Sequence, residues 1–201
     1  MKKNILSISV LFLSLNLMGQ NTSSNSSGHP YYQIPDYPAE YTAETVAARM
    51  VDGLGFRYYW ATEGLRTDDL AYKPNDEART SEETIDHILG LTNVILNSVL
   101  KEPNVRSGEQ LKLTFDEKRK KTLENLKQTS DILKASKPGA LKDYKIVFQN
   151  DERSTEYPFW NQINGPISDA LWHVGQVVSL RRSSGNPFNS KVSVLSGKLR
   201  E

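Results

Sequence analysis

The chain has 201 residues, of which 24% are charged, and its 25 lysines and arginines nearly balance its 24 aspartates and glutamates. A formal net charge of +1 lacks the basic excess of nucleic-acid-binding proteins, so we expect no nucleic acid partner. The sequence contains no cysteine, which excludes disulfides, thiolate ligands, a cysteine nucleophile and lipid attachment through a cysteine. The length suits one domain with a hydrophobic core of its own.

The first 20 residues have the pattern of a secretory signal peptide. Lys2 and Lys3 form a basic start, residues 5–18 are largely apolar, and Gly19 offers a small residue for cleavage. This apolar run of about 14 residues is shorter than the roughly 20 that a transmembrane helix requires, so cleavage is favoured over anchoring. We therefore predict an exported protein, periplasmic or secreted, with no stable membrane insertion once the signal peptide is removed.

Residues 21–40 are polar and then rich in proline and tyrosine, which predicts a flexible leader whose tyrosines lie on the surface of the following domain, residues 41–201. A first helix is predicted from Thr42 to about Leu65, because apolar residues recur there every three or four positions. The residues of this stripe are Val46, Met50, Leu54, Tyr58, Ala61 and Leu65. The neighbouring Trp60 either lines a pocket or simply packs in the core, and ordinary packing is the favoured interpretation.

Two capping boxes mark the starts of a second and a third helix. Thr80 and Glu83 open the second helix, and Thr114 and Glu117 open the third, which continues to about residue 136. His87 lies off the main apolar stripe of the second helix, on a side that also carries apolar residues. A helix with two apolar faces is buried between neighbours, so we expect His87 inside a helical bundle.

A short segment before the last helix predicts a small β-hairpin. Residues 144–148 are rich in β-formers, a polar turn follows at 149–152, and the chain returns to Tyr157. We expect this hairpin to shape the mouth of a pocket, with Trp160 and Trp172 near its rim. Simple packing of both tryptophans is the alternative.

The stretch from Gly165 to Pro187 predicts the last helix. Gly165 and the proline after it break the preceding segment, and Gly185 near the end supplies a left-handed C-terminal cap. Asp169 and His173 are four residues apart, which places them about 6 Å apart along the axis on one face. A carboxylate and an imidazole in that relation can bind one metal ion.

The chain has only three histidines, which limits the candidates for a further ligand. His29 lies in a serine- and asparagine-rich stretch and is not expected to be held rigidly, whereas His87 lies on the second helix. His87, Asp169 and His173 together form a set of two imidazoles and one carboxylate, suited to Zn, Fe(II), Ni or Mn with positions left open for water. The competing interpretation is a core histidine at 87 and a simple pair between the other two residues.

In these residues the chain resembles the DinB-like (DinB/YfiT) family of metalloenzymes. The resemblance covers residues 40–187 and is carried by the helix histidine in TIDHILGL and by a late helix with His173, Gly175-Gln176 and Arg181-Arg182. It implies a four-helix bundle with a metal site in its core. Family members usually present three histidines, one from the second helix and two spaced by four on the last. His87 and His173 match two of them, and Asp169 stands where the third usually lies.

We therefore predict an all-α fold, a four-helix bundle of the DinB/YfiT type with a small β-hairpin between the third and fourth helices. Short and medium connections favour largely antiparallel neighbours. The tail at residues 188–201 contains enough apolar residues to dock on the bundle without forming a domain. Bundles of this kind are commonly dimers, so a homodimer is an open alternative to a monomer.

Three functions are compatible with these residues. The leading one is a metal-dependent enzyme acting on an unidentified small-molecule substrate, with hydrolysis as its reaction. Thiol-dependent transfer, known among relatives in the wider family, is less favoured because reduced small thiols are mainly cytoplasmic. The second is a metal- or ligand-binding module without catalysis, with an apolar pocket among Trp60, Trp160 and Trp172. The third is a structural bundle that has lost the metal.

Three further side chains of the last helix have two interpretations each. Gln176, one turn beyond His173, is predicted to orient a substrate or a water, and a helix-surface amide is an equal alternative. Arg181 and Arg182 either receive an anionic group or favour the C-terminus of their own helix through its dipole, which we prefer.

Overall fold

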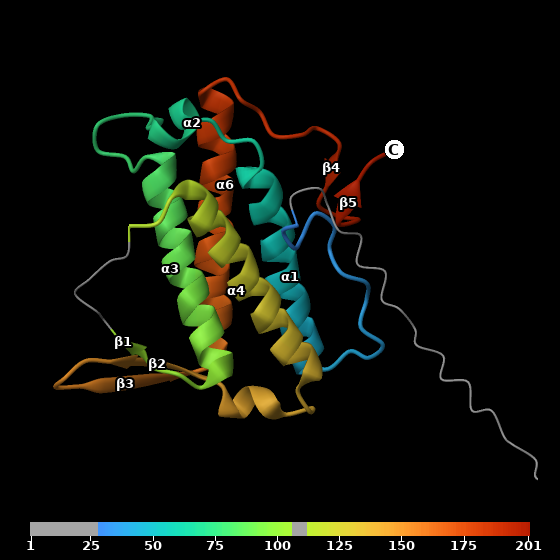
Figure 1. Cartoon of the computed structure of the whole chain (residues 1–201). Helices are drawn as coiled ribbons and strands as arrows, with labels where there is room; N and C mark the ends of the chain where they lie inside the picture. The colour runs from blue at the N-terminus through green and yellow to red at the C-terminus, as the bar shows by residue number, and fades with distance from the viewer. Residues whose placement is uncertain (1–27, 106–111) are drawn as a thin grey trace, which may run out of the picture.

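The computed structural model describes residues 28–105 and 112–201, so the expected signal peptide and the first part of the leader lie outside the described residues. The described chain is mostly helical and carries two small sheets at its periphery (Figure 1). Within this described part, the helices are too short or too polar to cross a membrane.

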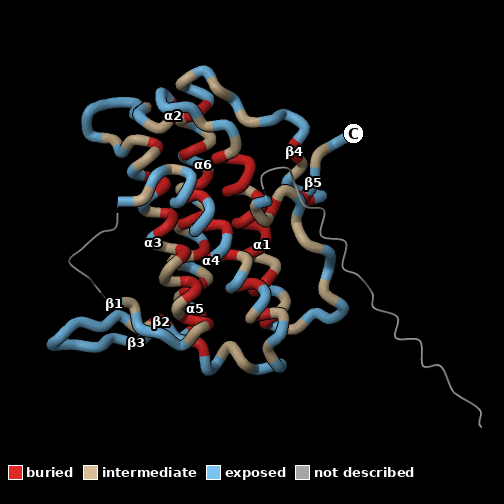
Figure 2. Tube along the Cα trace, in the orientation of Figure 1, coloured by how far each residue is buried: buried red, intermediate tan, exposed pale blue. Residues whose placement is uncertain are grey.

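Four long helices surround the core, and shorter turns connect them. The long helices are α1 (Ala43–Thr62), α3 (Ser81–Leu100), α4 (Phe115–Ala135) and α6 (Ser168–Ser183). The short elements are α2 (Thr67–Ala71), the 3-10 turn η1 (Ala140–Asp143), α5 (Trp160–Gln162) and the π-helical segment η2 (Ile163–Ile167). Both α1 and α3 pack against α4 and against α6, and the buried residues gather between these four helices (Figure 2).

Helices α3 and α4 run in the same direction. Lys118, near the start of α4, pairs with Glu82 near the start of α3, with 2.9 Å between Nζ and Oε1. Further along, Asn125 of α4 donates to Asn93 of α3 at 2.8 Å. The chain therefore returns between the two helices to the end where α3 began. This parallel pair departs from the largely antiparallel arrangement that the connection lengths favoured.

Contacts between side chains and neighbouring helices also give the relative directions of α3 and α6 and of α1 and α4. Helix α6 is antiparallel to α3, because Gln162, before α6, donates to the carbonyl of Val94 late in α3, while Asp169 meets His87 early in α3. Helix α4 is antiparallel to α1, because its last turns hold Lys134 at 2.6 Å from Asp52 in the middle of α1. The site described below depends on the α3 and α6 pair.

The second half of the leader is docked on α1. Tyr31 is only 4% exposed, and its hydroxyl donates to the buried carboxylate of Asp52 at 3.0 Å. Its ring occupies the space beside Gly55, where a Cβ atom would come within 2.5 Å of it. Burial, followed by the charge of Asp52, raises the pKa of Tyr31, so the hydroxyl stays protonated as a donor. This tyrosine is a core residue and not merely a surface contact.

The strands form the expected hairpin, one strand added to it, and a separate sheet in the tail. Strands β2 (Lys145–Gln149) and β3 (Ser154–Pro158) pair antiparallel between α4 and α6, and β1 (Asn104–Val105) joins β2 in parallel. In the tail, β4 (Val192–Ser193) and β5 (Lys198–Leu199) form a second sheet. The tail docks on the leader through a hydrogen bond of 2.8 Å from the Ile34 N–H to the Gly197 carbonyl.

The C-terminal end of α1 receives a guanidinium from α6. Arg181 is 2% exposed and donates from Nη1 to the carbonyls of Trp60, Ala61 and Glu63, at 3.2, 2.9 and 3.0 Å. These carbonyls have no partner within their own helix, because a helix leaves its last carbonyls unpaired. Arg181 was expected to favour the end of its own helix, and it instead caps α1.

Next to Arg181, a buried carboxylate joins α2 to the end of α6. Asp69 accepts from Nη2 and Nε of Arg66 at 2.7 and 3.0 Å, from Nδ2 of Asn186 at 2.6 Å, and from the hydroxyl of Ser184. The hydrogen bonds from Arg66 outweigh burial and, with those from Ser184 and Asn186, hold the pKa of Asp69 well below its usual value. The carboxylate is therefore ionised wherever the protein is folded at ordinary pH.

Replacing this carboxylate should change the pH dependence of stability. Asp69→Asn should lower the free energy of unfolding at neutral pH by about 1–3 kcal/mol, because an amide cannot accept from all four donors. A depressed folded-state pKa contributes stability that is present above the unfolded pKa of about 4 and is lost as the pH falls below it. Urea unfolding of both proteins should therefore show a constant difference above about pH 5 that narrows below about pH 4. A difference that stays constant down to about pH 3 would contradict this assignment.

Candidate metal site

His87 is placed by the local start of α3. The hydroxyl of Thr80 accepts from the N–H of Glu83, and the Glu83 carboxylate accepts from the N–H of Thr80, so the helix begins where the capping box predicts. Two turns later His87 stands beside the buried Ile85 and Ile88, with its own side chain 35% exposed. The imidazole therefore lies at the boundary between core and solvent.

Asp169 and His173 are placed by a kinked helix. Segments α5, η2 and α6 follow one another directly along the chain, and the helical structure is interrupted by a kink at Gly165, whose φ of −98° and ψ of −111° are not helical. Pro166 lacks an N–H and cannot continue the ladder there. The expected break at Gly165 and Pro166 is thus a bend just before Asp169, and π segments of this kind often adjoin functional sites.

The structure brings the three predicted ligands together. Nε2 of His87 lies 3.3 Å from Oδ2 of Asp169, and Nε2 of His173 lies 3.3 Å from Oδ1 of the same carboxylate. The two imidazole rings stand at 89° with centroids 4.6 Å apart. One ligand atom from each residue lies within 4.8 Å of the other two. We call these three residues the metal site.

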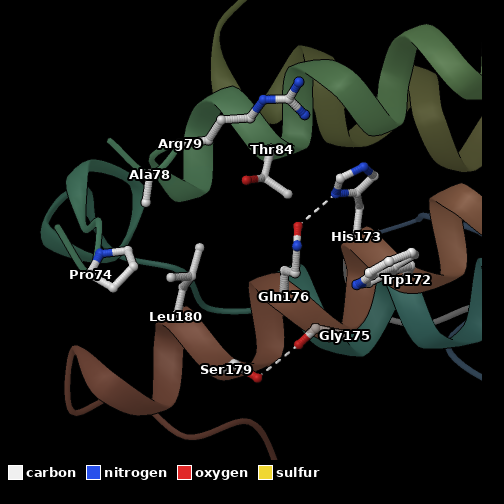
Figure 3. A pocket seen from close by; sticks show the side chains of 10 residues that line it. All are labelled: Pro74, Ala78, Arg79, Thr84, Trp172, His173, Gly175, Gln176, Ser179 and Leu180. Carbon is white, nitrogen blue, oxygen red and sulfur yellow. Dashed lines mark hydrogen bonds between the residues drawn. The ribbon is translucent and has the colours of Figure 1, made fainter. Parts of the chain in front are cut away.

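Gln176 fixes the protonation of one ligand. Its Oε1 lies 2.6 Å from Nδ1 of His173, and an amide oxygen only accepts, so Nδ1 carries the proton (Figure 3). The lone pair of the neutral ring is then on Nε2, which faces an oxygen of Asp169. A positive charge between these two electron-rich atoms, either a proton or a metal ion, would turn their repulsion into attraction. Metal-bound histidines are usually oriented in the way that Gln176 orients His173, with the ring nitrogen that does not face the metal donating its proton to a nearby acceptor.

The distances fit a divalent cation. With metal–ligand bonds of about 2.1 Å, neighbouring ligand atoms lie about 3.0 Å apart in octahedral geometry and about 3.4 Å apart in tetrahedral geometry. The two nitrogen–oxygen distances of 3.3 Å lie in this interval. The side chain of His173 is 14% exposed and that of Asp169 is 40% exposed, so one side of the site opens to solvent. The donor set therefore fits Zn, Fe(II), Ni or Mn with positions left for other ligands.

The contacts of His87 show which carboxylate it faces. Its partner is Asp169 on the opposite helix, whereas the neighbouring Asp86 pairs with Lys118 of α4, with 2.8 Å between Nζ and Oδ1. His29 is not part of the metal site among the described residues. A protonated imidazole paired with Asp169 is the arrangement that competes with a bound ion.

A pocket of about 600 Å³ adjoins the metal site, and we call it the α6 pocket (Figure 3). Its residues come from α6, the start of α3 and the connection before α3: Pro74, Ala78, Arg79, Thr84, Trp172, His173, Gly175, Gln176, Ser179 and Leu180. The connection, and not the hairpin, forms the wall opposite α6. Trp172 lies at this pocket as expected, whereas Trp160 is 76% exposed and is not among its residues.

The aromatic residues do not share one pocket. Trp60 lies in a separate apolar pocket of about 330 Å³ between α1, α6 and the tail, and its Nε1 donates to the Tyr32 carbonyl. Several residues of the α6 pocket were not predicted from the sequence, among them Thr84, Ser179 and Arg79. Thr84 and Ser179 had a signal, since each lies three residues from His87 or Gln176 on one helix. Arg79 had none, because it precedes its helix.

Comparison with protein-family models, with curated proteins and with solved structures found no match to this chain. The resemblance to the DinB-like family therefore stays a prediction from the sequence motifs quoted above.

Removing the acceptor on His173 should weaken metal binding. Gln176→Leu should lower the affinity for Zn by about ten- to a hundredfold, because the His173 ring loses the group that fixes its tautomer and orientation. Gln176→Glu, which keeps an acceptor, should retain most of the affinity. Competition for Zn against a chromophoric chelator measures the affinity of both variants. Ser179→Ala is the control, since among the described residues the Ser179 hydroxyl bonds only to the Gly175 carbonyl of its own helix. Equal affinity in Gln176→Leu and the wild type would contradict the assigned role.

Proposed function

We propose that this chain is an exported, DinB-like metal-binding protein whose four long helices form a four-helix bundle, and that it is a metal-dependent hydrolase. The observation that carries the proposal is the convergence of His87, Asp169 and His173 beside an open pocket, with Gln176 holding the His173 proton on Nδ1. The packing of α1 and α3 each against α4 and α6 supports the bundle.

Each residue of the metal site has a defined role in this proposal. His87 and His173 would hold the ion through Nε2, and Asp169 through a carboxylate oxygen. A divalent ion in this set supplies Lewis acidity, which polarises a substrate oxygen and lowers the pKa of water. Two neutral imidazoles and one carboxylate cancel only one of its two charges. The site therefore keeps a net positive charge that favours an oxygen atom bearing negative charge.

Several features favour hydrolysis over other reactions of such a centre. The chain contains no cysteine for covalent catalysis, and export would take it away from the reduced small thiols of the cytoplasm. The α6 pocket reaches His173 and is open to solvent on one side, so water and a small molecule can enter together. Gln176 acts here as a positioning residue for His173 and leaves its amide nitrogen for a substrate oxygen.

Metal content tests this proposal directly. The mature protein, purified without chelators, should contain about one transition-metal ion per chain. Asp169→Ala, His173→Ala and His87→Asn should each lose it and unfold at a lower temperature, whereas Lys120→Ala, on the exposed face of α4, should do neither. The metal-loaded protein should hydrolyse some member of a panel of activated esters, amides and phosphoesters, and lose that activity on chelation. No metal after reconstitution with Zn, Ni, Mn and Fe(II) would overturn the proposal.

Export has its own test. The intact mass of the protein recovered from its native host should correspond to a chain that begins near Gln20, because cleavage is expected after a small residue at the end of the apolar run. A chain that still begins at Met1 would contradict export and leave the metal site untouched.

A further inference from the structure

A guanidinium group lies on the wall of the α6 pocket that faces α6. Arg79 precedes the N-cap of α3, and its side chain extends along α3 above Thr84 (Figure 3). His173 of the metal site lines the same pocket from α6. The guanidinium and the metal site therefore border one pocket from different helices, and one small molecule can contact both.

The charge of Arg79 has no partner within the described part of the chain. The ion pairs and hydrogen bonds of this part do not include its guanidinium, in contrast to Arg66, which binds Asp69 through two nitrogens. The hydrogen bonds from the N–H and hydroxyl of Thr80, and to a smaller extent the charge of Arg79, lower the pKa of Glu83. The ten pocket residues include no aspartate or glutamate. The α6 pocket thus carries a guanidinium that makes no ion pair with a carboxylate of the described residues.

The other walls add to this preference. The side-chain oxygen of Gln176 contacts His173, and its amide nitrogen has no hydrogen-bond partner among the described residues. Trp172 is 73% exposed and offers a flat apolar surface at the mouth. A volume of about 600 Å³ is that of a small-molecule site. The pocket therefore offers two kinds of hydrogen-bond donor, the Arg79 guanidinium and the Gln176 amide nitrogen, together with an apolar surface at its mouth.

We propose that Arg79 selects substrates that carry an oxyanion, a carboxylate or a phosphate, at the end opposite the group on which the metal site acts. The inference rests on the proposed function, because the metal site defines the other end of the substrate. A guanidinium binds either oxyanion through two parallel hydrogen bonds, which fixes orientation as well as charge. Arg79 is a specificity residue in this arrangement, and it takes no part in the reaction itself.

Hydroxamates with different tails test this inference without requiring turnover. A hydroxamate group ligates the Zn ion, and a three-carbon chain carries a carboxylate, a phosphonate or a neutral primary amide at its far end. Calorimetry on Zn-loaded wild-type protein should show about tenfold tighter binding of at least one anionic probe than of the amide probe. The better anionic tail identifies the oxyanion.

Substitution of the guanidinium separates selection from structure. Arg79→Gln should bind the amide probe as the wild type does and lose the preference for anionic tails, and Arg79→Lys should restore part of it, since it keeps the charge without the fork. Arg153→Gln, an exposed arginine in the hairpin turn that also lacks an ion pair among the described residues, should behave as the wild type.

The outcomes distinguish this inference from the proposed function. Equal binding of all three probes to a wild-type protein that contains Zn would overturn the selection by Arg79 and leave the metal site in place. Equal weakening of all three probes in Arg79→Gln would assign the residue a structural role and also overturn the inference. A wild-type protein that binds neither Zn nor any probe would overturn the proposed function and this inference with it.

Discussion

The axial position of α6 is the constraint on which the rest of this structure depends. At one end, Arg181 reaches the carbonyls that terminate α1, and at the other, Gln162 donates to the carbonyl of Val94 in α3. Unpaired carbonyls in these buried positions would each cost roughly 1–3 kcal/mol, so α6 cannot slide without losing several hydrogen bonds. A shift of one turn, about 5.4 Å, would also carry Asp169 and His173 away from His87.

The two faces of α6 therefore have separate tasks. The face toward α1 carries Arg181 and fixes the helix, and the face toward α3 carries the ligands and the pocket. The kink at Gly165 changes the direction of the chain between Gln162, which bonds to α3 before the kink, and Asp169, which faces His87 after it. The metal site is thus a product of backbone geometry as much as of residue type.

Local patterns predicted much of this arrangement, and non-local contacts account for the rest. The capping box at Thr80 fixed the start of α3. Helical spacing, the scarcity of histidine and the resemblance to the DinB-like family together selected His87, Asp169 and His173, which the structure brings together. The parallel direction of α3 and α4 was missed, because it depends on how distant side chains pack and not on any short pattern. Tyr31 was expected at the surface because no local sequence pattern reveals the space beside Gly55 that its ring fills. That space forms only when the chain folds. Arg79 was missed because a loop residue carries no periodicity to place it.

The separation of the ligands along the chain has a consequence for folding rates. His87 and Asp169 are 82 residues apart, so the contact between them closes a long loop, and the parallel return between α3 and α4 adds further distant contacts. Chains dominated by such contacts fold slowly for their size. An ion that bound across α3 and α6 would need these helices to have met first. It would therefore slow unfolding far more than it would speed folding, and it would protect the protein kinetically against proteolysis.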